Sequence, residues 1–355
     1  MITILVVGGA GYIGSHVCMA LKDAGYDPVV FDNLSTGHPW AVQFGKLIQG
    51  TIDDEEGLLK TFDQVQPKAV IHLASLINVR DSINNPAIFY ENLLGTLTLL
   101  KVMVQKNVNH IVFSSSAAVY GEPKYTPIDE NHPKEPMNAY GRTKLAIEGM
   151  LKDFSSAHGL YFAALRYFNA CGADPKTQIG EAHLPETHLI PLAIRTAMGQ
   201  EPILKIYGDT YSTQDGTAVR DYVHVVDLGR AHVKALEYLL EKNKNLIVNL
   251  GSGTGYSVRE IIDEVERFSQ KEIKTKVVPK FIHDTPALIA ESSLAEKLLH
   301  WKPNYSDLPS IIETAWKWHE DFSIKPLQKL KELREKSDQL AKDKNISTMT
   351  SMYQG

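Results

Sequence analysis

The fold is decided by a stretch near the start of the chain, TILVVGGAGYIGSH, which occupies residues 3–16. Its first part, residues 3–7, is a short apolar run typical of a buried strand. Its second part holds glycines at positions 8, 9, 11 and 14, and apolar residues at helical spacing follow. Glycines let the backbone turn sharply, and the free N–H groups of the next helix then point at whatever lies above the turn. The stretch therefore predicts a strand–turn–helix unit that binds a diphosphate.

A second apolar run, residues 28–31, ends at Asp32, about 20 residues after the glycines. A carboxylate at the end of the second strand can accept hydrogen bonds from both hydroxyls of an adenosine ribose. The same carboxylate repels a 2′-phosphate, and Asn33 and Leu34 add no cation. The sequence therefore predicts NAD rather than NADP as cofactor. A tight turn followed by a solvated aspartate is the plainer alternative.

The composition is that of an ordinary globular protein. The 355 residues are enough for one large domain or two lobes. A net charge of −5 and the lack of a basic stripe argue against nucleic acid as a partner. No apolar run approaches membrane-spanning length and no signal peptide is evident, so we expect a cytoplasmic protein without a membrane partner. We expect Cys18 and Cys171 to be reduced, buried thiols.

Apolar runs and amphipathic segments alternate through the first half of the chain. Further strands are expected at residues 46–49, 69–73, 111–115 and 160–168, and helices at 53–65, 86–106 and 138–157. This alternation predicts an α/β fold of the Rossmann type, a doubly wound parallel sheet with right-handed crossovers. Ligands of such sheets bind beyond the carboxyl ends of the strands.

The alternation ends near residue 169. Long polar loops cover residues 171–185 and 207–217, and helical patterns follow at 226–240, 258–268 and 308–321. We predict a NAD-binding domain at 1–168, rejoined by parts of 219–255 such as strand 246–250, and a smaller α/β substrate-binding lobe at 169–322. Residues 323–355 are expected to form a surface helix over 326–342 and a disordered tail.

Tyr140 and Lys144 stand four residues apart in the predicted helix 138–157, so they share one helix face. A free phenol has a pKa of about 10, which is too high for a base at neutral pH. A nearby ammonium, and the positive ring of a bound NAD, would lower that pKa. Ser116 follows the fifth strand, where its hydroxyl can relay a proton to Tyr140. The three residues predict a proton-transfer site, and the alternative is a surface lysine beside a half-buried tyrosine.

Several segments resemble the extended short-chain dehydrogenase/reductase family, and within it the group of UDP-glucose (galactose) 4-epimerases. The matching segments are GGAGYIGSH (8–16), FDNLSTGH (31–38), FSSSAAVYGEP (113–123), AYGRTK (139–144), LRYFNACGA (165–173), ETHLIPL (186–192), YGDTYSTQDGTAVRDYVHVVDL (207–228) and NLGSGTGYSV (249–258). They extend through most of the chain, and the stretch from Asp215 to Tyr222 is the most specific of them.

The resemblance implies epimerisation at C4 of a UDP-hexose through a 4-keto intermediate, with NAD bound throughout. Tyr140 would be the base, Ser116 would assist it, and Lys144 would hold the nicotinamide ribose. The implied cofactor contacts are Gly8, Gly11, Tyr12, Ile13, Gly14, Asp32, Asn33, Leu73, Ala74, Asn92, Ser114, Tyr140, Lys144 and Tyr167. The implied substrate contacts are Ser116, Asn169, His188, Leu189, Tyr207, Arg220 and Leu288.

Plainer roles remain open for three of these residues. Asn169 could instead satisfy the backbone of its own loop. Arg220 could instead pair with Asp221 on the surface, and His188 could instead cap the apolar helix that follows it. No metal is expected, because the histidines lack ligand spacing and no acid–histidine cluster stands out. The resemblance also implies a homodimer, in which the two long helices at 86–106 and 138–157 pair with their copies.

Other activities on the same fold remain as alternatives. A nucleotide-sugar 4,6-dehydratase would need acid–base groups after Ser116, where Ala117 and Ala118 stand. Another nucleotide-sugar epimerase would share the same cofactor half. A non-catalytic protein that binds NAD or a nucleotide sugar would be expected to lack the tyrosine or the lysine.

The sequence departs from the family pattern at a few places. Thr51 stands where an aspartate would contact adenine, and the loop 74–78 lacks a lysine near the cofactor. Phe281 stands where an arginine would grip the diphosphate, although Lys280 could supply a point charge there. We expect weaker nucleotide affinity with intact chemistry. Leu288 is intermediate in size, so N-acetylated sugars remain open as substrates.

Overall fold

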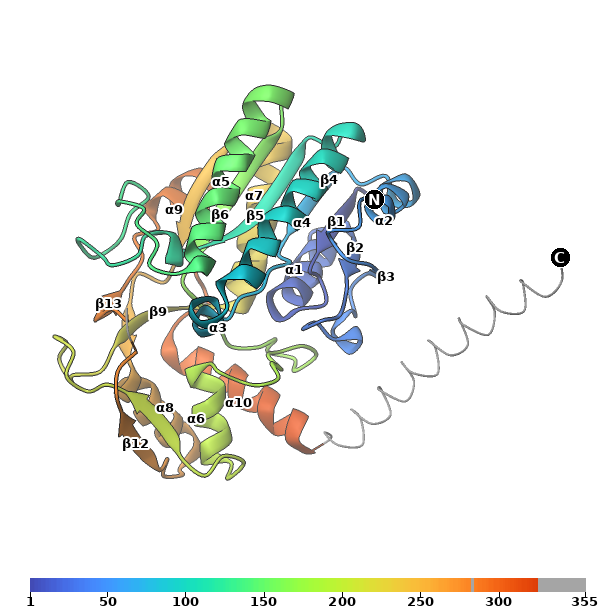
Figure 1. The fold of residues 1–355 in the computed structure, drawn as a ribbon. Helices are drawn as coiled ribbons and strands as arrows, with labels where there is room; N and C mark the ends of the chain where they lie inside the picture. The colour runs from blue at the N-terminus through green and yellow to red at the C-terminus, as the bar shows by residue number, and fades with distance from the viewer. Residues whose placement is uncertain (282–283, 325–355) are drawn as a thin grey trace.

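A computed structural model describes residues 1–281 and 284–324 of the chain. Within them, the large sheet has seven strands in the order β10-β6-β5-β4-β1-β2-β3, and neighbouring strands run parallel (Figure 1). Its strands are β1 (Thr3–Val7), β2 (Asp27–Asp32), β3 (Lys46–Gln49), β4 (Ala69–His72), β5 (His110–Ser116), β6 (Tyr161–Tyr167) and β10 (Leu246–Leu250). The predicted Rossmann-type fold is confirmed. The predictions for residues 326–355 lie outside the described residues.

The glycine turn joins β1 to helix α1 (Tyr12–Asp23). Gly8 has a φ of +86°, and a Cβ there would lie 2.5 Å from the backbone nitrogen of Ala74. A Cβ on Gly14 would lie 2.1 Å from the carbonyl oxygen of Gly8. Only glycine fits both positions, so the turn brings helix, strand and the loop after β4 closer together than other residues would allow.

Helices cover both faces of the large sheet (Figure 1). On one face, α1 packs against α7 (Val225–Lys242), and α9 (Ser293–Leu299) packs beside α7. The other face carries α2 (Glu55–Val65), α4 (Pro86–Gln105) and α5 (Ala139–His158), with the short α3 (Val79–Asn84) packed against α4 and α5. Short 3₁₀ turns, η1 (Pro39–Ala41) and η2 (Ala117–Val119), follow β2 and β5. Each face of the sheet therefore has its own apolar core.

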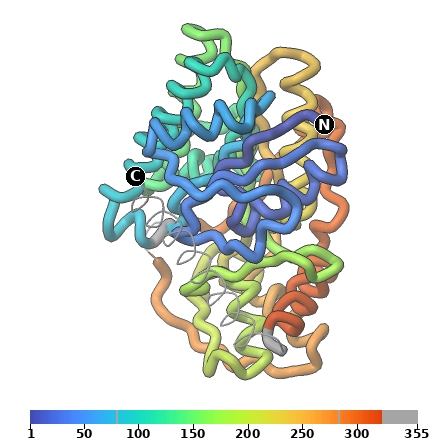
Figure 2. Tube along the Cα trace, turned by 90° about the vertical axis from the view of Figure 1, so that its right-hand side faces the viewer, coloured from blue at the N-terminus to red at the C-terminus, as the bar shows by residue number. Residues whose placement is uncertain are grey.

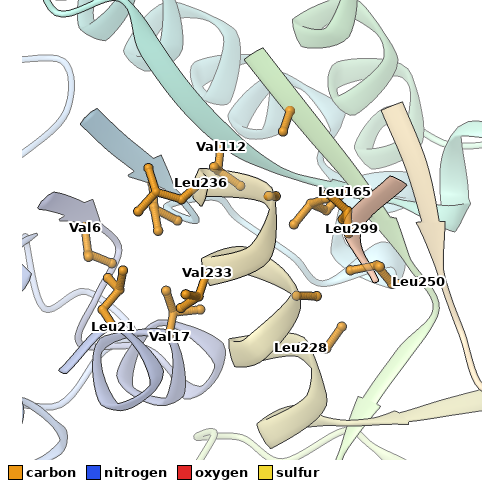
Figure 3. Close-up of a cluster of buried hydrophobic side chains, with 14 of the residues drawn as sticks. Val6, Val17, Leu21, Val112, Leu165, Leu228, Val233, Leu236, Leu250 and Leu299 are labelled. Atoms are coloured by element: carbon orange, nitrogen blue, oxygen red, sulfur yellow. The ribbon is translucent and has the colours of Figure 1, made fainter. Parts of the chain in front are cut away.

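The core on the α7 face holds together parts of the chain that are far apart in sequence. Figure 3 shows side chains from α1 and α7 gathered against those from the strands and from α9. They include Val17 and Leu21 of α1, Leu228, Val233 and Leu236 of α7, Val6, Val112, Leu165 and Leu250 of the sheet, and Leu299 of α9. Most of these side chains have no exposed surface, so α7 is an integral part of the larger lobe.

The smaller lobe lies beyond the carboxyl edge of the large sheet (Figure 2). Its helices are α6 (Leu189–Ala197), α8 (Val258–Ser269) and α10 (Leu308–Ile324), which share an apolar core. Strands β8 (Leu204–Tyr207) and β12 (Thr275–Val278) pair in parallel. Strand β9 (Val219–His224) pairs with β7 (Asn169–Cys171), β11 (Gly255–Ser257) and β13 (Ala287–Leu288). After β9 the chain returns to the larger lobe as α7 and β10.

Helix α4 corrects one expectation from the sequence. Among the described residues it is the one helix whose length and composition would suffice to cross a membrane, whereas no such run was predicted. Its apolar character has a structural use in the fold. Phe89, Leu99, Leu100 and Met103 are fully buried, and Leu99, Leu100 and Met103 belong to the core on this face of the sheet.

Both cysteines are buried, free thiols, as predicted. Burial raises the pKa of Cys18 to about 12 and raises the pKa of Cys171 well above its ordinary value. Both groups therefore remain protonated and weakly nucleophilic at neutral pH.

Candidate active site

A cavity of about 750 Å³ opens at the carboxyl edge of the large sheet, against the smaller lobe. Because the strands are parallel and in register, the residues that follow them meet at this edge. The predicted site residues in its wall are Gly8, Gly11, Tyr12, Ile13, Gly14, Asp32, Asn33, Leu73, Ala74, Asn92, Ser116, Tyr140, Lys144, Tyr167, Asn169, His188, Arg220 and Leu288. The fold thus gathers most of the predicted residues around one space.

Asp32 lies at the end of β2, directly beside the glycine turn. Its Oδ2 accepts a hydrogen bond from the N–H of Ala10 at 2.9 Å, and its Oδ1 accepts one from the N–H of Leu34 at 2.8 Å. These bonds fix the carboxylate in the cavity wall, and each oxygen keeps a second lone pair for a ligand. Gly11 begins α1 without a side-chain cap, so the first N–H groups of this helix are left for an anion.

The loop after β4 forms another part of the wall. The N–H groups of Leu73 and Ala74 both donate to the carbonyl of Val7, at 2.8 and 3.0 Å. Asn92 of α4 accepts from the N–H of Leu76 at 3.0 Å and donates to its carbonyl at 3.4 Å. Asn92 therefore holds this loop in place beside the glycine turn.

The three predicted catalytic residues are brought together. Tyr140 lies in the first turn of α5, which Asn138 caps by accepting from the N–H of Gly141 at 2.8 Å. Ser116 lies in the same cavity wall as Tyr140, and its side chain acts to lower the pKa of the Tyr140 phenol. Lys144 lies one turn further along α5, where its Nζ donates to the carbonyl of Ser114 at 2.9 Å and lies 5.6 Å from the centre of the Tyr140 ring.

Burial acts on both titrating groups of this trio. Desolvation raises the pKa of Tyr140, and the Ser116 side chain opposes that rise. Desolvation lowers the pKa of Lys144 to about 7. The sequence predicted that the lysine ammonium, and further the ring of bound NAD, would lower the pKa of the tyrosine. In the structure the opposing influence on Tyr140 is the Ser116 hydroxyl.

Ser114 is placed differently from the other predicted cofactor contacts. Its side chain is buried and hydrogen-bonded to His232 of α7 at 3.1 Å, and it also bonds Tyr167. It is not among the residues in the cavity wall. Ser114 therefore supports Tyr167 and, through its carbonyl, Lys144.

On the substrate side, Arg220 of β9 points to the cavity and is paired with Asp284. The surface pair with Asp221 that the sequence left open is not formed. Asp221 is buried, and its carboxylate accepts from the N–H groups of Ser252, Gly253 and Ala290 at 2.8, 3.0 and 3.1 Å. Asp221 therefore organises the backbone around Arg220. Asp284, 64 residues from Arg220 in sequence, is a site residue that the sequence reasoning missed.

Leu189 and Tyr207 lie outside the cavity wall. Tyr207 stacks on Phe281, with 4.2 Å between ring centres. The Lys280 ammonium lies 5.7 Å from the centre of the Tyr211 ring, and Lys280 does not line the cavity either. The position where the family pattern expects an arginine is thus occupied by an aromatic pair.

A cluster of acids and histidines forms the wall beside Tyr12. Glu181 accepts from Nδ1 of His183 at 2.9 Å and from Nδ1 of His188 at 2.7 Å. Glu186 accepts from Nδ1 of His188 at 2.9 Å. The linear spacing predicted no acid–histidine cluster, and the structure corrects this because the loop folds all four side chains to within 4.8 Å of one another.

The cluster changes the proton affinity of its members. Burial alone would lower the pKa of His188, but the carboxylates of Glu181 and Glu186 raise it to about 10. Burial alone would raise the pKa of Glu181, but His188 and His183 lower it to about 2. His188 precedes α6 but makes no side-chain cap there. Its side chain is therefore a protonated partner of two carboxylates.

Comparison with known proteins agrees with this geometry. Residues 4–251 match the model of the NAD dependent epimerase/dehydratase family. The UDP-glucose 4-epimerase of Rhizobium meliloti (strain 1021) is 47% identical over 317 residues, which cover 89% of this chain and 96% of that protein. The chain belongs to the NAD dependent epimerase/dehydratase family.

Solved structures in the same family have the same fold. The UDP-glucose 4-epimerase from Brucella ovis in complex with NAD is 47% identical, with a TM-score of 0.87 over 89% of this chain and 98% of that one. The enzyme from Bifidobacterium longum in complex with NAD+ and UDP is 37% identical, with a TM-score of 0.86 over 90% and 98% of the two chains. NAD is the cofactor of the family, and the uncapped α1, the close glycine turn and the Asp32 carboxylate fit its diphosphate and ribose.

Proposed function

We infer that this protein inverts the configuration at C4 of a UDP-hexose and so interconverts UDP-glucose and UDP-galactose. The observation that carries this inference is the meeting of Ser116, Tyr140 and the buried Lys144 in the wall of one cavity, with Lys144 one helical turn beyond Tyr140. The three groups stand at the wall of a cavity that also holds the glycine turn and Asp32. The relatives that match nearly the whole chain are named UDP-glucose 4-epimerases.

The residues of the larger lobe would hold the cofactor. The glycine turn and α1 would bind the diphosphate of NAD, Asp32 the adenosine ribose, and Lys144 the nicotinamide ribose. When bound, NAD supplies a ring that takes a hydride from C4 of the sugar and later returns it to the opposite face. A cofactor regenerated in every turnover has no need to leave, which suits its tight enclosure.

The chain's own residues would move the proton. Tyr140 takes the proton of the 4-hydroxyl, with Ser116 as relay, and gives it back after the 4-keto sugar has turned about its link to the diphosphate. Lys144, with a pKa of about 7, would stabilise the Tyr140 phenolate while its own ammonium is protonated. Ala117 and Ala118 form η2 directly after Ser116, so the acid–base groups that a dehydratase needs after the serine are not supplied there.

The smaller lobe would hold the UDP part of the substrate. We propose that Asn169, His188 and Arg220 bind the diphosphate, because all three reach the cavity wall. Leu288, paired with Arg220 in the β9–β13 ladder, would border the sugar. Leu189 and Tyr207 would contact the uracil beyond the cavity described above, with Phe281 stacked behind Tyr207. Whether N-acetylated sugars are accepted then depends on the space beside Leu288.

We also propose that the protein is a cytoplasmic homodimer without a nucleic-acid or membrane partner. Tyr90, Leu94 and Leu97 on α4 expose 43%, 63% and 39% of their surface, next to α5 on the same face. An exposed apolar row on a pair of long helices suits an interface with a second copy. The two free thiols support the proposed cytoplasmic location, and the mild net charge of −5 supports the proposal that nucleic acid is not a partner.

A coupled assay tests the proposed reaction. The purified chain should convert UDP-galactose to UDP-glucose without added NAD. Tyr140→Phe removes only the hydroxyl and should lower kcat by about 10²- to 10⁴-fold, the usual size of a proton-transfer contribution, at an unchanged melting temperature. An inactive wild-type enzyme with bound NAD, or full activity of Tyr140→Phe, would contradict the proposal.

A further inference from the structure

Glu148 is a buried carboxylate that the proposed reaction does not use. It lies on α5 one turn beyond Lys144 and two turns beyond Tyr140, so the three side chains share a face of the helix. Its side chain exposes 1% of its surface. A buried carboxylate remains charged only when it is paired with a cation and hydrogen-bonded. The groups that bind Glu148 therefore indicate what it does.

Glu148 is bonded to both strands that face it. Arg166 of β6 donates from Nε to Oε1 at 2.9 Å and from a terminal nitrogen to Oε2 at 2.6 Å. The hydroxyl of Ser115 of β5 donates to Oε1 at 2.6 Å. The other terminal nitrogen of Arg166 donates to the Tyr120 hydroxyl at 2.9 Å. Two parallel bonds between planar groups define the orientation of the pair as well as its distance.

The register of the sheet places this contact directly below the site. Ser115 and Arg166 are partners in the β5–β6 ladder, and the next pair along is Ser116 and Tyr167, which both line the cavity. Helix α5 therefore contacts three consecutive residues of β5. Lys144 donates to the carbonyl of Ser114, and Glu148 accepts from the hydroxyl of Ser115. Tyr140 and Ser116 meet in the cavity wall.

Stability alone does not require this ion pair. Apolar side chains of similar size often replace a buried ion pair without loss of stability, and α5 already packs through Ile147 and Leu151 into the core. Apolar packing, however, tolerates small rotations and shifts of a helix that a forked ion pair resists. Such shifts matter here, because a displacement of about 1 Å at a catalytic group can lower a rate by about 10²-fold.

We propose that Glu148 is a positioning residue for the epimerase reaction. Through Arg166 and Ser115 it fixes the rotation of α5 about its axis and its position along the strands β5 and β6. The Tyr140 hydroxyl then meets Ser116, and the Lys144 ammonium meets the Ser114 carbonyl. The inference rests on the proposed function, because it assigns a role toward the groups that move the proton there.

Three variants of the full chain test the proposal. Glu148→Gln keeps the shape and loses the charge, and the double variant Glu148→Met with Arg166→Met replaces the pair without leaving a charge unpaired. The control, Asp227→Asn, weakens another buried carboxylate, which accepts from the N–H groups of Asn304 and Tyr305 away from the cavity. For each, kcat and KM for UDP-galactose are measured from pH 5 to 9, together with the melting temperature.

Both Glu148 variants are expected to lower kcat at least tenfold while KM changes by less than about twofold. The acid limb of the kcat profile should move to higher pH, because a displaced Tyr140 loses the nearby Ser116 side chain that acts to lower its pKa. Asp227→Asn should lower the melting temperature and leave the shape of the profile unchanged.

A double variant with wild-type kcat would overturn the proposal. The proposal would also fail if kcat fell in proportion to the melting temperature in the Glu148 variants and the Asp227→Asn control alike. If neither Glu148 variant folds, Ser115→Ala decides: kcat should fall about threefold or more, and an unchanged kcat counts against the proposal. The activity of the wild type distinguishes failure of the proposed reaction from failure of the role of Glu148. An inactive wild type refutes the epimerase reaction. The role of Glu148 is judged only from the kcat of each variant relative to an active wild type.

Discussion

Lys144 is a residue of the site whose surroundings strongly lower its proton affinity. It exposes 3% of its surface and lies among Phe113, Tyr140 and the Ser114 carbonyl. Desolvation lowers its pKa from 10.5 to about 7. Such a group costs folding free energy while it is charged, and it is retained here beside the tyrosine that would exchange a proton.

Replacing this lysine should reveal that cost as a function of pH. Between the folded pKa of about 7 and the unfolded value of 10.5, the unfolded chain holds a proton that the folded chain lacks, so the free energy of unfolding rises with pH. Lys144→Met should therefore be more stable than wild type by the largest margin below pH 7, and the margin should shrink toward pH 10. Urea unfolding at pH 6, 8 and 9.5 measures it, and a margin independent of pH would show that Lys144 is not desolvated.

Phe281 stands at the position where the family resemblance leads us to expect an arginine. It stacks on Tyr207 where an arginine would approach the diphosphate. Phe281→Arg should raise the affinity for UDP about tenfold, because a charge-assisted hydrogen bond contributes roughly 1.5–3 kcal/mol and the lost stack offsets part of it. Calorimetric titration with UDP measures the change. Phe281→Met, which loses the stack without adding a charge, is the control and should bind more weakly than wild type. Equal affinities of the arginine and methionine variants would refute the expectation.

Among the elements, the strands of the large sheet and the long helices were predictable, and the strands of the smaller lobe were not. The strands of the large sheet up to β6 are apolar runs, and α5 begins after the capping residue Asn138, so local pattern was sufficient. Strands β7, β9 and β13 were missed. They are two to six residues long and exist because β9 pairs with segments that lie far from it along the chain.

The same reason explains which site residues could be predicted. Tyr140, Lys144 and Ser116 were found because a helical turn and a strand end are local features. The pairing of Arg220 with Asp284 and the coupling of Glu148 to Arg166 join separate elements, which no local spacing reveals. The acid–histidine loop has its residues close in sequence, but its compact fold does not follow from their spacing.

That loop makes a prediction of its own through His188. In the folded chain its pKa is raised to about 10, against 6.5 when unfolded. Its stabilising effect is therefore complete below about pH 6.5 and is lost as pH rises through 10. His188→Asn should cost more free energy of unfolding at pH 6 than at pH 10. Urea unfolding at both values measures this, with His158→Asn in the exposed last turn of α5 as control. An equal loss at both pH values would contradict the ion-paired state of His188.

At the scale of the whole molecule, the outer face of α4 carries a row of exposed apolar side chains, Tyr90, Leu94 and Leu97. Leu94, with 63% of its surface exposed, lies in the middle of α4. If this face joins two copies, Leu94→Glu should shift the sedimentation coefficient from that of a dimer to that of a monomer, because like charges would meet across the two-fold axis. Val277→Glu on β12, 44% exposed in the wild type, is the matched control and should leave the dimer intact. A wild-type monomer would remove the proposed interface.

The path of the chain between its two lobes also bears on how the protein is made. Helix α7 covers one face of the sheet and β10 forms its edge. Both follow β7, α6, β8 and β9 of the smaller lobe along the chain, so they are synthesised after them. Until α7 has left the ribosome, Val112 and Leu165 therefore lack the side chains of α7 that cover them in the folded protein. Co-translational folding of the nucleotide-binding half is thereby postponed until about residue 250, and until then the exposed apolar face is a target for chaperones.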